Sequence, residues 1–211
     1  DTSQTLYTQT TYDALGNAVA NRDIGGNYSY KTYDLVGRVA HEVDALGFVT
    51  GHVRNTFGDA IRLTRYGAAS GLAAGSPASL GAAQVEVTVA GLDHSADRTL
   101  LTDYDRLGRA IQITEPIVYV HDNSLSSAQG FMAGKTTRNT YNTFGELAQV
   151  AQLKSAGNWT LTSNFYDRRG QQVASVDAMG YVTTQAFDGA GNVAARTEYA
   201  KIEKSLTEAE I

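Results

Sequence analysis

Ten short segments of this 211-residue chain contain the residue types that could do chemistry, because each begins with Asp or Asn and has Gly three positions later. Eight of the ten starting residues are carboxylates, which act as acid–base pairs only where unequal environments separate their pKa values. Positions that repeat have similar environments, so a catalytic role is disfavoured. Asp or Asn instead caps a type I turn through backbone N–H groups, and Gly then takes the left-handed conformation. We therefore predict that the following are structural turn residues: Asp13, Gly16, Asp23, Gly26, Asp34, Gly37, Asp44, Gly47, Asn55, Gly58, Asp105, Gly108, Asn142, Gly145, Asp167, Gly170, Asp177, Gly180, Asp188 and Gly191.

Metal chemistry has little support in the sequence. The chain has four histidines, and they follow neither HExxH nor another usual ligand spacing. His41 and His52 could face each other across one hairpin, which leaves a fortuitous zinc site as an alternative. Residues 93–97 (DHSAD) resemble the start of a calcium loop, but Arg98 replaces the expected glycine, so a surface turn is the better interpretation. We predict no metal site and no cofactor.

Other catalytic signatures are missing from the sequence. It contains no G-x-S-x-G nucleophile elbow and no phosphate-binding GK[ST] after its glycine-rich stretch. It has no cysteine, which excludes thiolate nucleophiles and disulfides. We predict that the chain is not an enzyme.

Aromatic residues offer two interpretations. They could form a surface that stacks on sugar rings, or they could be packed in half-buried strands with their hydroxyl groups in water. Packing is the favoured interpretation, and glycan stacking stays open for five residues: Tyr28, Tyr30, Tyr33, Trp159 and Tyr181.

The spacing of the turns defines the elements between them. The first five turns begin 10 or 11 residues apart, which leaves six or seven residues, about one strand, between them. A type I turn followed by a left-handed glycine is a usual hairpin connection. Segments such as 27–33 (NYSYKTY) and 181–187 (YVTTQAF) have the β-branched and aromatic residues of strands. The sequence therefore predicts an all-β fold, an antiparallel β-hairpin meander with a repeat of about 21 residues.

A longer repeat and several interruptions organise the chain. Adding 133 carries residues 43–50 (VDALGFVT) onto 176–183 (VDAMGYVT), so the array itself is duplicated. We expect one continuous repeat domain with four parts: a repeat array at 1–66, an Ala/Gly/Ser-rich excursion with one strand at 67–99, a second array at 100–199 with an insertion at 115–135, and a tail at 200–211.

Finer expectations concern the interruptions. The stretch from 67 to 84 is predicted as a flexible excursion or a short weak helix, and Val85–Val89 (VEVTV) as a strand. Within the insertion, Ile117–Val120 is expected to be a strand and 122–134 a loop. Residues 154–159 (KSAGNW) are expected at a hairpin tip, and the tail from Tyr199 to Ile211 as a short helix.

Composition narrows the classes of partner. The net charge of −5 lacks the cationic excess that a phosphate-binding surface needs, so nucleic acid is not expected. No apolar run reaches the roughly 18–20 residues of a membrane span. Twenty-one glycines and two prolines suit many short strands joined by glycine turns.

Several turns carry a fuller signature, Tyr-Asp-x-x-Gly, and the half-unit Asp-Ala-Leu/Met-Gly-x-Val-Thr accompanies it at 44–50 and 177–183. Three turns depart from the Tyr-Asp pair, at Arg54-Asn55, Tyr141-Asn142 and Phe187-Asp188. The sequence resembles the YD/RHS repeat family, which includes bacterial Rhs proteins, the B and C subunits of insecticidal toxin complexes, and teneurins. The signature occurs four times: Tyr12–Asn17 (YDALGN), Tyr33–Arg38 (YDLVGR), Tyr104–Arg109 (YDRLGR) and Tyr166–Gly170 (YDRRG).

The resemblance implies a spiralling β-sheet that forms a hollow shell and often encloses a toxic domain. It implies a non-catalytic wall segment of a secreted or cell-surface protein, with a carbohydrate-binding adhesion module as the alternative. The expected partners are neighbouring repeats, an enclosed toxin domain, glycans in the alternative, and a second copy through edge strands. The self-cleaving core motif of the family, with its paired aspartates, does not occur in these 211 residues, so autoproteolysis is not assigned.

Overall fold

The computed structural model describes residues 6–72, 80–121, 130–155 and 158–202. The chain divides into two compact units, residues 1–101 and residues 102–211. The described residues form sixteen β-strands and one α-helix, so the predicted all-β fold is confirmed. None of the described helical segments has the length and apolar character needed to cross a membrane.

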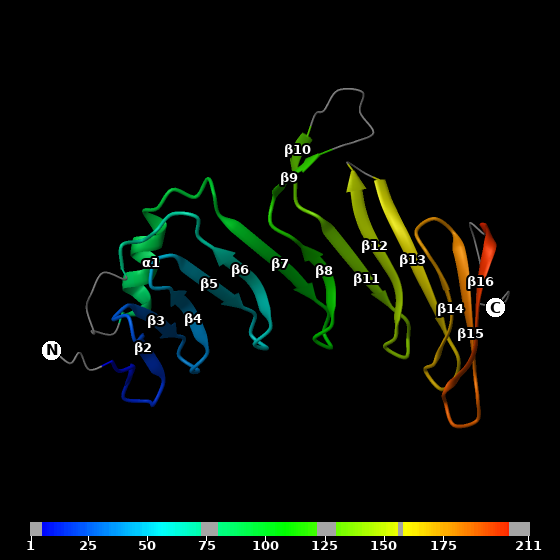
Figure 1. Ribbon diagram of the computed structural model, residues 1–211, viewed down its shortest axis with the longest axis horizontal. Coiled ribbons are helices and arrows are strands. Elements are labelled where there is room, and N and C mark those ends of the chain that lie inside the picture. The colour runs from blue at the N-terminus through cyan, green and yellow to red at the C-terminus, as the bar shows by residue number, and fades with distance from the viewer. Residues whose placement is uncertain (1–5, 73–79, 122–129, 156–157, 203–211) are drawn as a thin grey trace. The chain divides into compact units, whose positions relative to one another are not determined.

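The first unit is an antiparallel meander in which each strand pairs with the next one along the chain (Figure 1). One-residue register shifts occur where strands enter turns, for example between Thr32 and Tyr33, as expected for hairpins with a left-handed glycine. The strands are β1 (Gln9–Tyr12), β2 (Ala18–Arg22), β3 (Tyr28–Tyr33), β4 (Val39–Val43), β5 (Val49–Arg54), β6 (Ala60–Arg65) and the start of β7 (Arg98–Tyr104).

The second unit repeats this plan, with one separate hairpin in its insertion. The strands of the meander are β8 (Ala110–Thr114), β11 (Thr136–Tyr141), β12 (Leu147–Ser155), β13 (Asn158–Tyr166), β14 (Gln172–Val176), β15 (Tyr181–Phe187) and β16 (Val193–Ile202). The separate hairpin consists of β9 (Val118–His121) and β10 (Gly130–Ala133).

Several expectations for the interruptions can now be compared with the structure. The predicted strand at Ile117–Val120 is present as β9, one residue later. The predicted loop over 122–134 is wrong for residues 130–133, which form β10 because they pair with β9, while 122–129 lie outside the described residues. The predicted hairpin tip joins β12 to β13, where Ser155 pairs with Asn158.

The predicted strand at Val85–Val89 is wrong, because Ala82–Ala90 forms helix α1. A strand would place all three valines of VEVTV on one face. In the helix, Val85 and Val89 lie one turn apart and are 0% and 6% exposed, whereas Val87 points outward and is 76% exposed. Burial of Val85 and Val89 against the sheet outweighs the strand preference of β-branched residues. The core that results contains Ala20, Tyr30, Val43, Val49, Val85 and Val89.

The predicted helix in the tail is wrong for residues 199–202, which continue strand β16. The β-pairing with β15 extends to Ile202, which lies opposite Tyr181, and this pairing provides backbone hydrogen bonds that an isolated short helix would lack. Residues 203–211 lie outside the described part of the chain.

The two edges of each unit are used differently. We call turn edge the side with the turns at 13–16, 34–37 and 55–58 in the first unit and at 105–108, 142–145, 167–170 and 188–191 in the second (lower side in Figure 1). The opposite side, the insertion edge, has turns at 23–26, 44–47 and 177–180. It also carries the two longer connections between described strands of the meander, 66–97 and 115–135, and the two-residue connection 156–157.

The core predicts a contrast between two valines of the same helix. Val85→Ala removes a fully buried side chain and is expected to lower the free energy of unfolding by about 2 kcal/mol. Val87→Ala, at an exposed position, is expected to change it by less than about 0.5 kcal/mol. Urea unfolding followed by circular dichroism measures both. Equal effects would contradict the packing of α1.

Candidate functional site

The ten turns share one hydrogen-bonding arrangement. In the turn at 34–37, Asp34 Oδ1 accepts the N–H groups of Val36 at 3.0 Å and of Arg38 at 2.9 Å, and the N–H of Gly37 donates to Asp34 O at 3.0 Å. In all ten turns, Oδ1 of the first residue accepts the N–H four positions later. The ten glycines have φ between 76° and 100°, a conformation that favours glycine.

In seven of the ten turns, a second hydrogen bond joins the side chain of the turn residue to the side chain four positions later, and which of the two donates depends on the residue types. Where the turn begins with Asp, that side chain is a donor: Arg38 Nε lies 2.8 Å from Asp34 Oδ2. Where it begins with Asn, that side chain is an acid: Asn142 Nδ2 lies 2.6 Å from Glu146 Oε2. The turn at 55–58 has the same exchange, with an Asn and an Asp 2.9 Å apart. These partners were not predicted from the sequence, although the paired change of residue type four positions apart could have revealed them.

At four of the turn-edge turns, the residue before the turn joins neighbouring hairpins. Tyr33 of β3 donates its hydroxyl to the carbonyl of Ala18 in β2 at 2.9 Å. Tyr141 and Tyr166 make the same bond to Ala110 and to Leu147, each at 3.1 Å. These strand pairs are connected covalently only at the insertion edge. Each of these tyrosines therefore hydrogen-bonds its two strands together at the edge where the chain does not connect them.

Arg54 shows that another donor can take the tyrosine position. Its guanidinium Nη1 donates to the carbonyl of Val39, which stands 15 positions earlier, the separation also found between Tyr33 and Ala18. The departure Arg54-Asn55 from the Tyr-Asp pair therefore keeps the inter-strand hydrogen bond.

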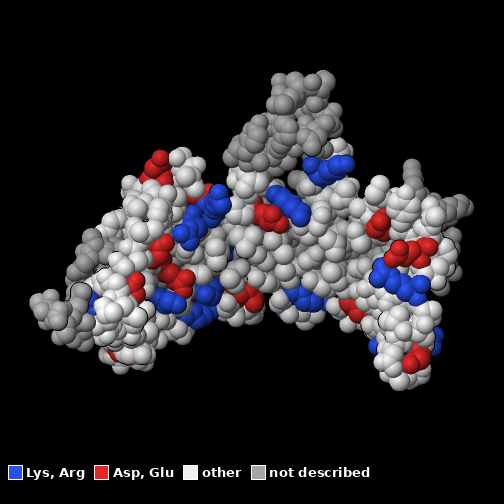
Figure 2. Space-filling model, viewed as in Figure 1, with Lys and Arg blue, Asp and Glu red and all other residues white. Residues whose placement is uncertain are grey.

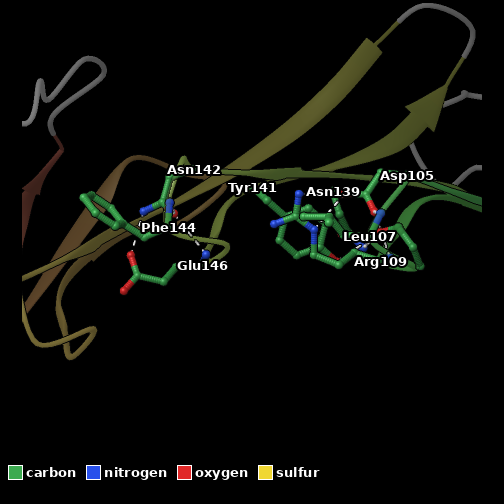
Figure 3. Close-up of polar contacts among 9 residues, drawn as sticks. Asp105, Leu107, Arg109, Asn139, Tyr141, Asn142, Phe144 and Glu146 are labelled. Carbon is green, nitrogen blue, oxygen red and sulfur yellow. Dashed lines mark hydrogen bonds and ion pairs between the residues drawn. The ribbon is translucent and has the colours of Figure 1, made fainter.

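An arginine connects successive turns in the second unit (Figure 3). Arg109 Nε lies 2.7 Å from Asp105 Oδ2, and its guanidinium carbon lies 4.4 Å from the ring centre of Tyr141. Asn139 Nδ2 donates to the same carbonyl of Ala110 as Tyr141, at 3.0 Å. Cation–π stacking and an ion pair thus join the turn at 105–108 to the strand that enters the next one.

The predicted aromatic residues do not gather into one platform. Tyr30 is 2% exposed in the core, so its ring cannot stack on a sugar. It stacks on Tyr28 with centroids 6.2 Å apart. Trp159 is covered on one face by the guanidinium of Arg138, 4.4 Å from its ring centre. Tyr33 uses its hydroxyl in the bond to β2. Glycan binding by Tyr28, Trp159 or Tyr181 stays a prediction.

The expectation that His41 and His52 face each other is wrong. Across the β4–β5 hairpin, the residue opposite His41 is Gly51, so His52 lies on the other face of the sheet. His41 Nδ1 lies 3.1 Å from Thr32 Oγ1, and burial lowers its pKa. In the turn at 93–97, Asp93 Oδ1 accepts the N–H of Ser95 at 2.9 Å, the arrangement of a surface turn. Within the described residues, no group of three His, Cys, Asp or Glu could hold a metal ion.

A groove of about 1020 Å³ lies between the turns at 142–145 and 167–170 and is the most plausible place for chemistry. Its lining includes Phe144, Glu146, Asn164, Tyr166 and Arg169. The polar groups already bond to the fold: Asn164 Nδ2 and the Tyr166 hydroxyl both donate to the carbonyl of Leu147. Burial raises the pKa of Tyr166, which disfavours a tyrosinate. The groove therefore presents structural hydrogen bonds rather than a nucleophile beside a base.

Comparison with known protein families finds a match for part of the chain. Residues 166–199 match the family described as RHS Repeat. This segment is similar to an RHS repeat. It runs from the end of β13 into β16 and contains turns on both edges. The resemblance recognised from the sequence is thereby confirmed.

Solved structures similar to this chain include toxin-complex proteins. The crystal structures of TcdB2-TccC3-Cdc42 and of TcdB2-TccC3 are each 16% identical over 93% of this chain, with TM-scores of 0.41 and 0.42. A Tc holotoxin pore of Photorhabdus luminescens is 12% identical over 90%, with a TM-score of 0.30. This chain spans only 10% to 13% of those chains. No curated protein matches it in sequence.

Charged side chains do not gather into a single patch on the visible face of the molecule (Figure 2). Figure 2 shows basic and acidic side chains interspersed on the visible face. Several form exposed ion pairs, such as Lys31 with Glu42 at 3.0 Å. Such pairs contribute little stability individually.

The hydrogen bond of the Tyr33 hydroxyl predicts a measurable cost of removing it. Tyr33→Phe removes the hydroxyl that donates to Ala18 O and is expected to lower the free energy of unfolding by about 1 kcal/mol. Tyr12→Phe is the matched control, because Tyr12 precedes the first turn and is 62% exposed. Chemical unfolding of both variants measures the difference. A Tyr33→Phe variant as stable as the control would contradict the inter-strand role.

The turn acids predict a loss of stability in acid. The amide and N–H of Asn17 hold the pKa of Asp13 below its usual 3.8, and the N–H and amide of Asn192 do the same for Asp188. The unfolded chain then binds more protons as pH falls, so this stabilisation is complete above pH 3.8 and is lost below it. Thermal unfolding at a series of pH values should show a smaller acid loss in Asp13→Asn/Asp188→Asn, because Asn still caps the turn. An unchanged pH profile would contradict the assignment.

Proposed function

We propose that this chain is a non-catalytic structural module, a segment of the wall of a larger RHS-repeat shell that encloses or displays a toxin domain. The polar residues that recur in its repeats are engaged in turns and inter-strand bonds, which supports a structural role. Family resemblance further supports a secreted or cell-surface parent protein.

One observation carries the proposal: large apolar side chains occupy the third position of five of the seven turn-edge turns, the exceptions being Arg169 and Ala190. Leu46 and Met179 occupy the same position in two insertion-edge turns and are also exposed. In the first unit, Leu15, Val36 and Phe57 are 85%, 70% and 86% exposed. In the second unit, Leu107 and Phe144 are 76% and 88% exposed. Single exposed apolar residues are ordinary, but recurrence at the third position of successive turns marks a contact surface.

A layered wall explains this recurrence. Neighbouring windings of a spiralling sheet would meet along the turn edge and remove the apolar tips from water, with a gain of about 25 cal/mol per Å² of apolar surface buried. The longer connections are confined to the insertion edge, which leaves the turn edge of each unit regular enough for such a contact.

Adhesion through glycans is the weaker alternative. Burial of Tyr30 and the cover of Arg138 over Trp159 reduce the aromatic surface that it would use.

Enclosure predicts that the two faces of the sheet differ in access within the full-length parent protein. Thr183 and Thr184 are adjacent, half-buried residues of β15 that point to opposite faces. The chain has no natural cysteine, so Thr183→Cys and Thr184→Cys give two matched single labels. A bulky polyethylene-glycol maleimide is expected to label both in the 211-residue chain. In the folded parent it should label only one.

The denatured parent, in which both cysteines should react, serves as the control for this labelling. Equal labelling of both positions in the folded parent would contradict enclosure and would favour an open surface module. Protection of both positions would also contradict a wall with one face in solvent.

A further inference from the structure

Two arginines lie directly opposite each other in the first unit, where strands β6 and β7 reach the insertion edge. Arg65 is the last residue of β6, Arg98 is the first of β7, and the register of the two strands pairs them. Both residues are exposed. Like charges directly opposite each other destabilise an antiparallel pair. This pair is therefore electrostatically unfavourable unless a negative charge lies between the two guanidinium groups.

The acids of the chain near this pair neutralise it only in part. Arg65 Nη2 lies 3.4 Å from Asp44 Oδ2, a long ion pair between side chains that are 58% and 41% exposed. Arg98 has no ion pair or side-chain hydrogen bond with any described residue. Its neighbour Asp97 is engaged elsewhere, since Asp97 Oδ1 accepts the N–H of Gly67 at 2.9 Å and its Oδ2 lies 2.8 Å from a histidine ring.

A hollow of about 230 Å³ is lined by both arginines. Phe48, Tyr66, Gly67 and Ala96 complete its lining, so two guanidinium groups stand beside an aromatic residue. The guanidinium carbon of Arg65 lies 5.9 Å from the ring centre of Phe48. The volume is below the roughly 300–1,000 Å³ of sites for drug-sized ligands, so the hollow suits a small charged group.

The second array shows that the repeat itself does not require an arginine here. Adding 133 carries Phe48 onto Tyr181, which keeps an aromatic ring, but it carries Arg65 onto Glu198, which reverses the charge. Arg65 and Glu198 both lie opposite a threonine of the preceding strand, so the strand pairing forms with either charge. The positive charge at Arg65 is therefore specific to the hollow of the first unit.

We propose that Arg65 and Arg98 form a binding site for one tetrahedral oxyanion, the sulfate or phosphate group of a monoester, whose organic part lies against Phe48. Guanidinium groups bind such oxygens through paired, charge-assisted hydrogen bonds. An anion held by both arginines replaces one unfavourable contact with two favourable ones.

A single oxyanion also agrees with the charge of the chain. The net charge of −5 disfavours an extended polyanion such as nucleic acid, whereas one oxyanion group needs only the two arginines. The site does not depend on the proposed wall function, because it uses neither the apolar turn tips nor enclosure. Each of the two proposals can therefore fail without the other.

The test is titration of the 211-residue chain with phenyl phosphate and phenyl sulfate at constant ionic strength, followed by the amide NMR signals of residues that line the hollow. Saturable binding in the millimolar range is expected. Inorganic phosphate, which has no ring to place against Phe48, should bind about threefold more weakly than phenyl phosphate. The ester that binds more tightly identifies which oxyanion the site prefers.

Four variants locate the binding. Arg65→Gln and Arg98→Gln each remove one charge and are expected to weaken the binding of the better ester about tenfold or more. Arg65→Glu introduces the residue type of the second array and should abolish binding. Arg62→Gln is the matched control, because Arg62 is an exposed arginine of the same strand on the other face, and its affinity should stay within about twofold.

Thermal unfolding separates ligand binding from a structural role. Without an anion, Arg98→Gln removes the like-charge pair, so its midpoint should equal or exceed that of the starting chain. With the better ester present, the midpoint should rise in the starting chain and in Arg62→Gln but not in Arg98→Gln. Absence of saturable binding by either ester, or binding that persists in both Arg65→Gln and Arg98→Gln, would overturn the proposal. A lower midpoint of Arg98→Gln without any anion would overturn it too, because Arg98 would then serve the fold.

Discussion

The rest of this structure depends on the hydrogen bonds of one carboxylate or amide oxygen to the backbone of its own turn. Oδ1 of the turn residue holds the N–H four positions later, and the glycine between them takes a positive φ that other residues rarely adopt. Because the same turn occurs ten times, it determines strand length, register and the one-residue shifts at strand ends. No large hydrophobic core is needed to specify a sheet whose connections are so uniform.

Side chains next to the turns then join neighbouring hairpins at the turn edge, where the chain does not connect them. The residue before the turn reaches the neighbouring strand, and the residue after the glycine pairs with the turn residue itself. The donor–acceptor character of that second pair is conserved even when the residues change, as the Asp34–Arg38 and Asn142–Glu146 pairs show. The two residues of the Tyr-Asp pair thus have different roles: the tyrosine bonds to the neighbouring strand, and the aspartate caps the turn.

The two edges of each unit differ in how much their connections vary. Longer connections and the helix lie at the insertion edge, where they leave the turn-edge hydrogen bonds undisturbed. Exposed apolar side chains at the turn tips are a surface left for other partners.

The sequence by itself determined the turns, the strands between them, the antiparallel order and the resemblance to RHS repeats. These features are local: each turn is complete within five residues, so the spacing of Asp, Asn and Gly contains the necessary information. The tertiary structure decided the features that depend on distant partners. VEVTV became a helix because Val85 and Val89 are buried on β-strands far away in sequence, and residues 199–202 became a strand because β15 supplies their hydrogen bonds. Tyr30 and Tyr33 have similar surroundings in sequence, yet one is core and the other closes a strand pair, because strand register alone sets which face and which carbonyl each side chain meets.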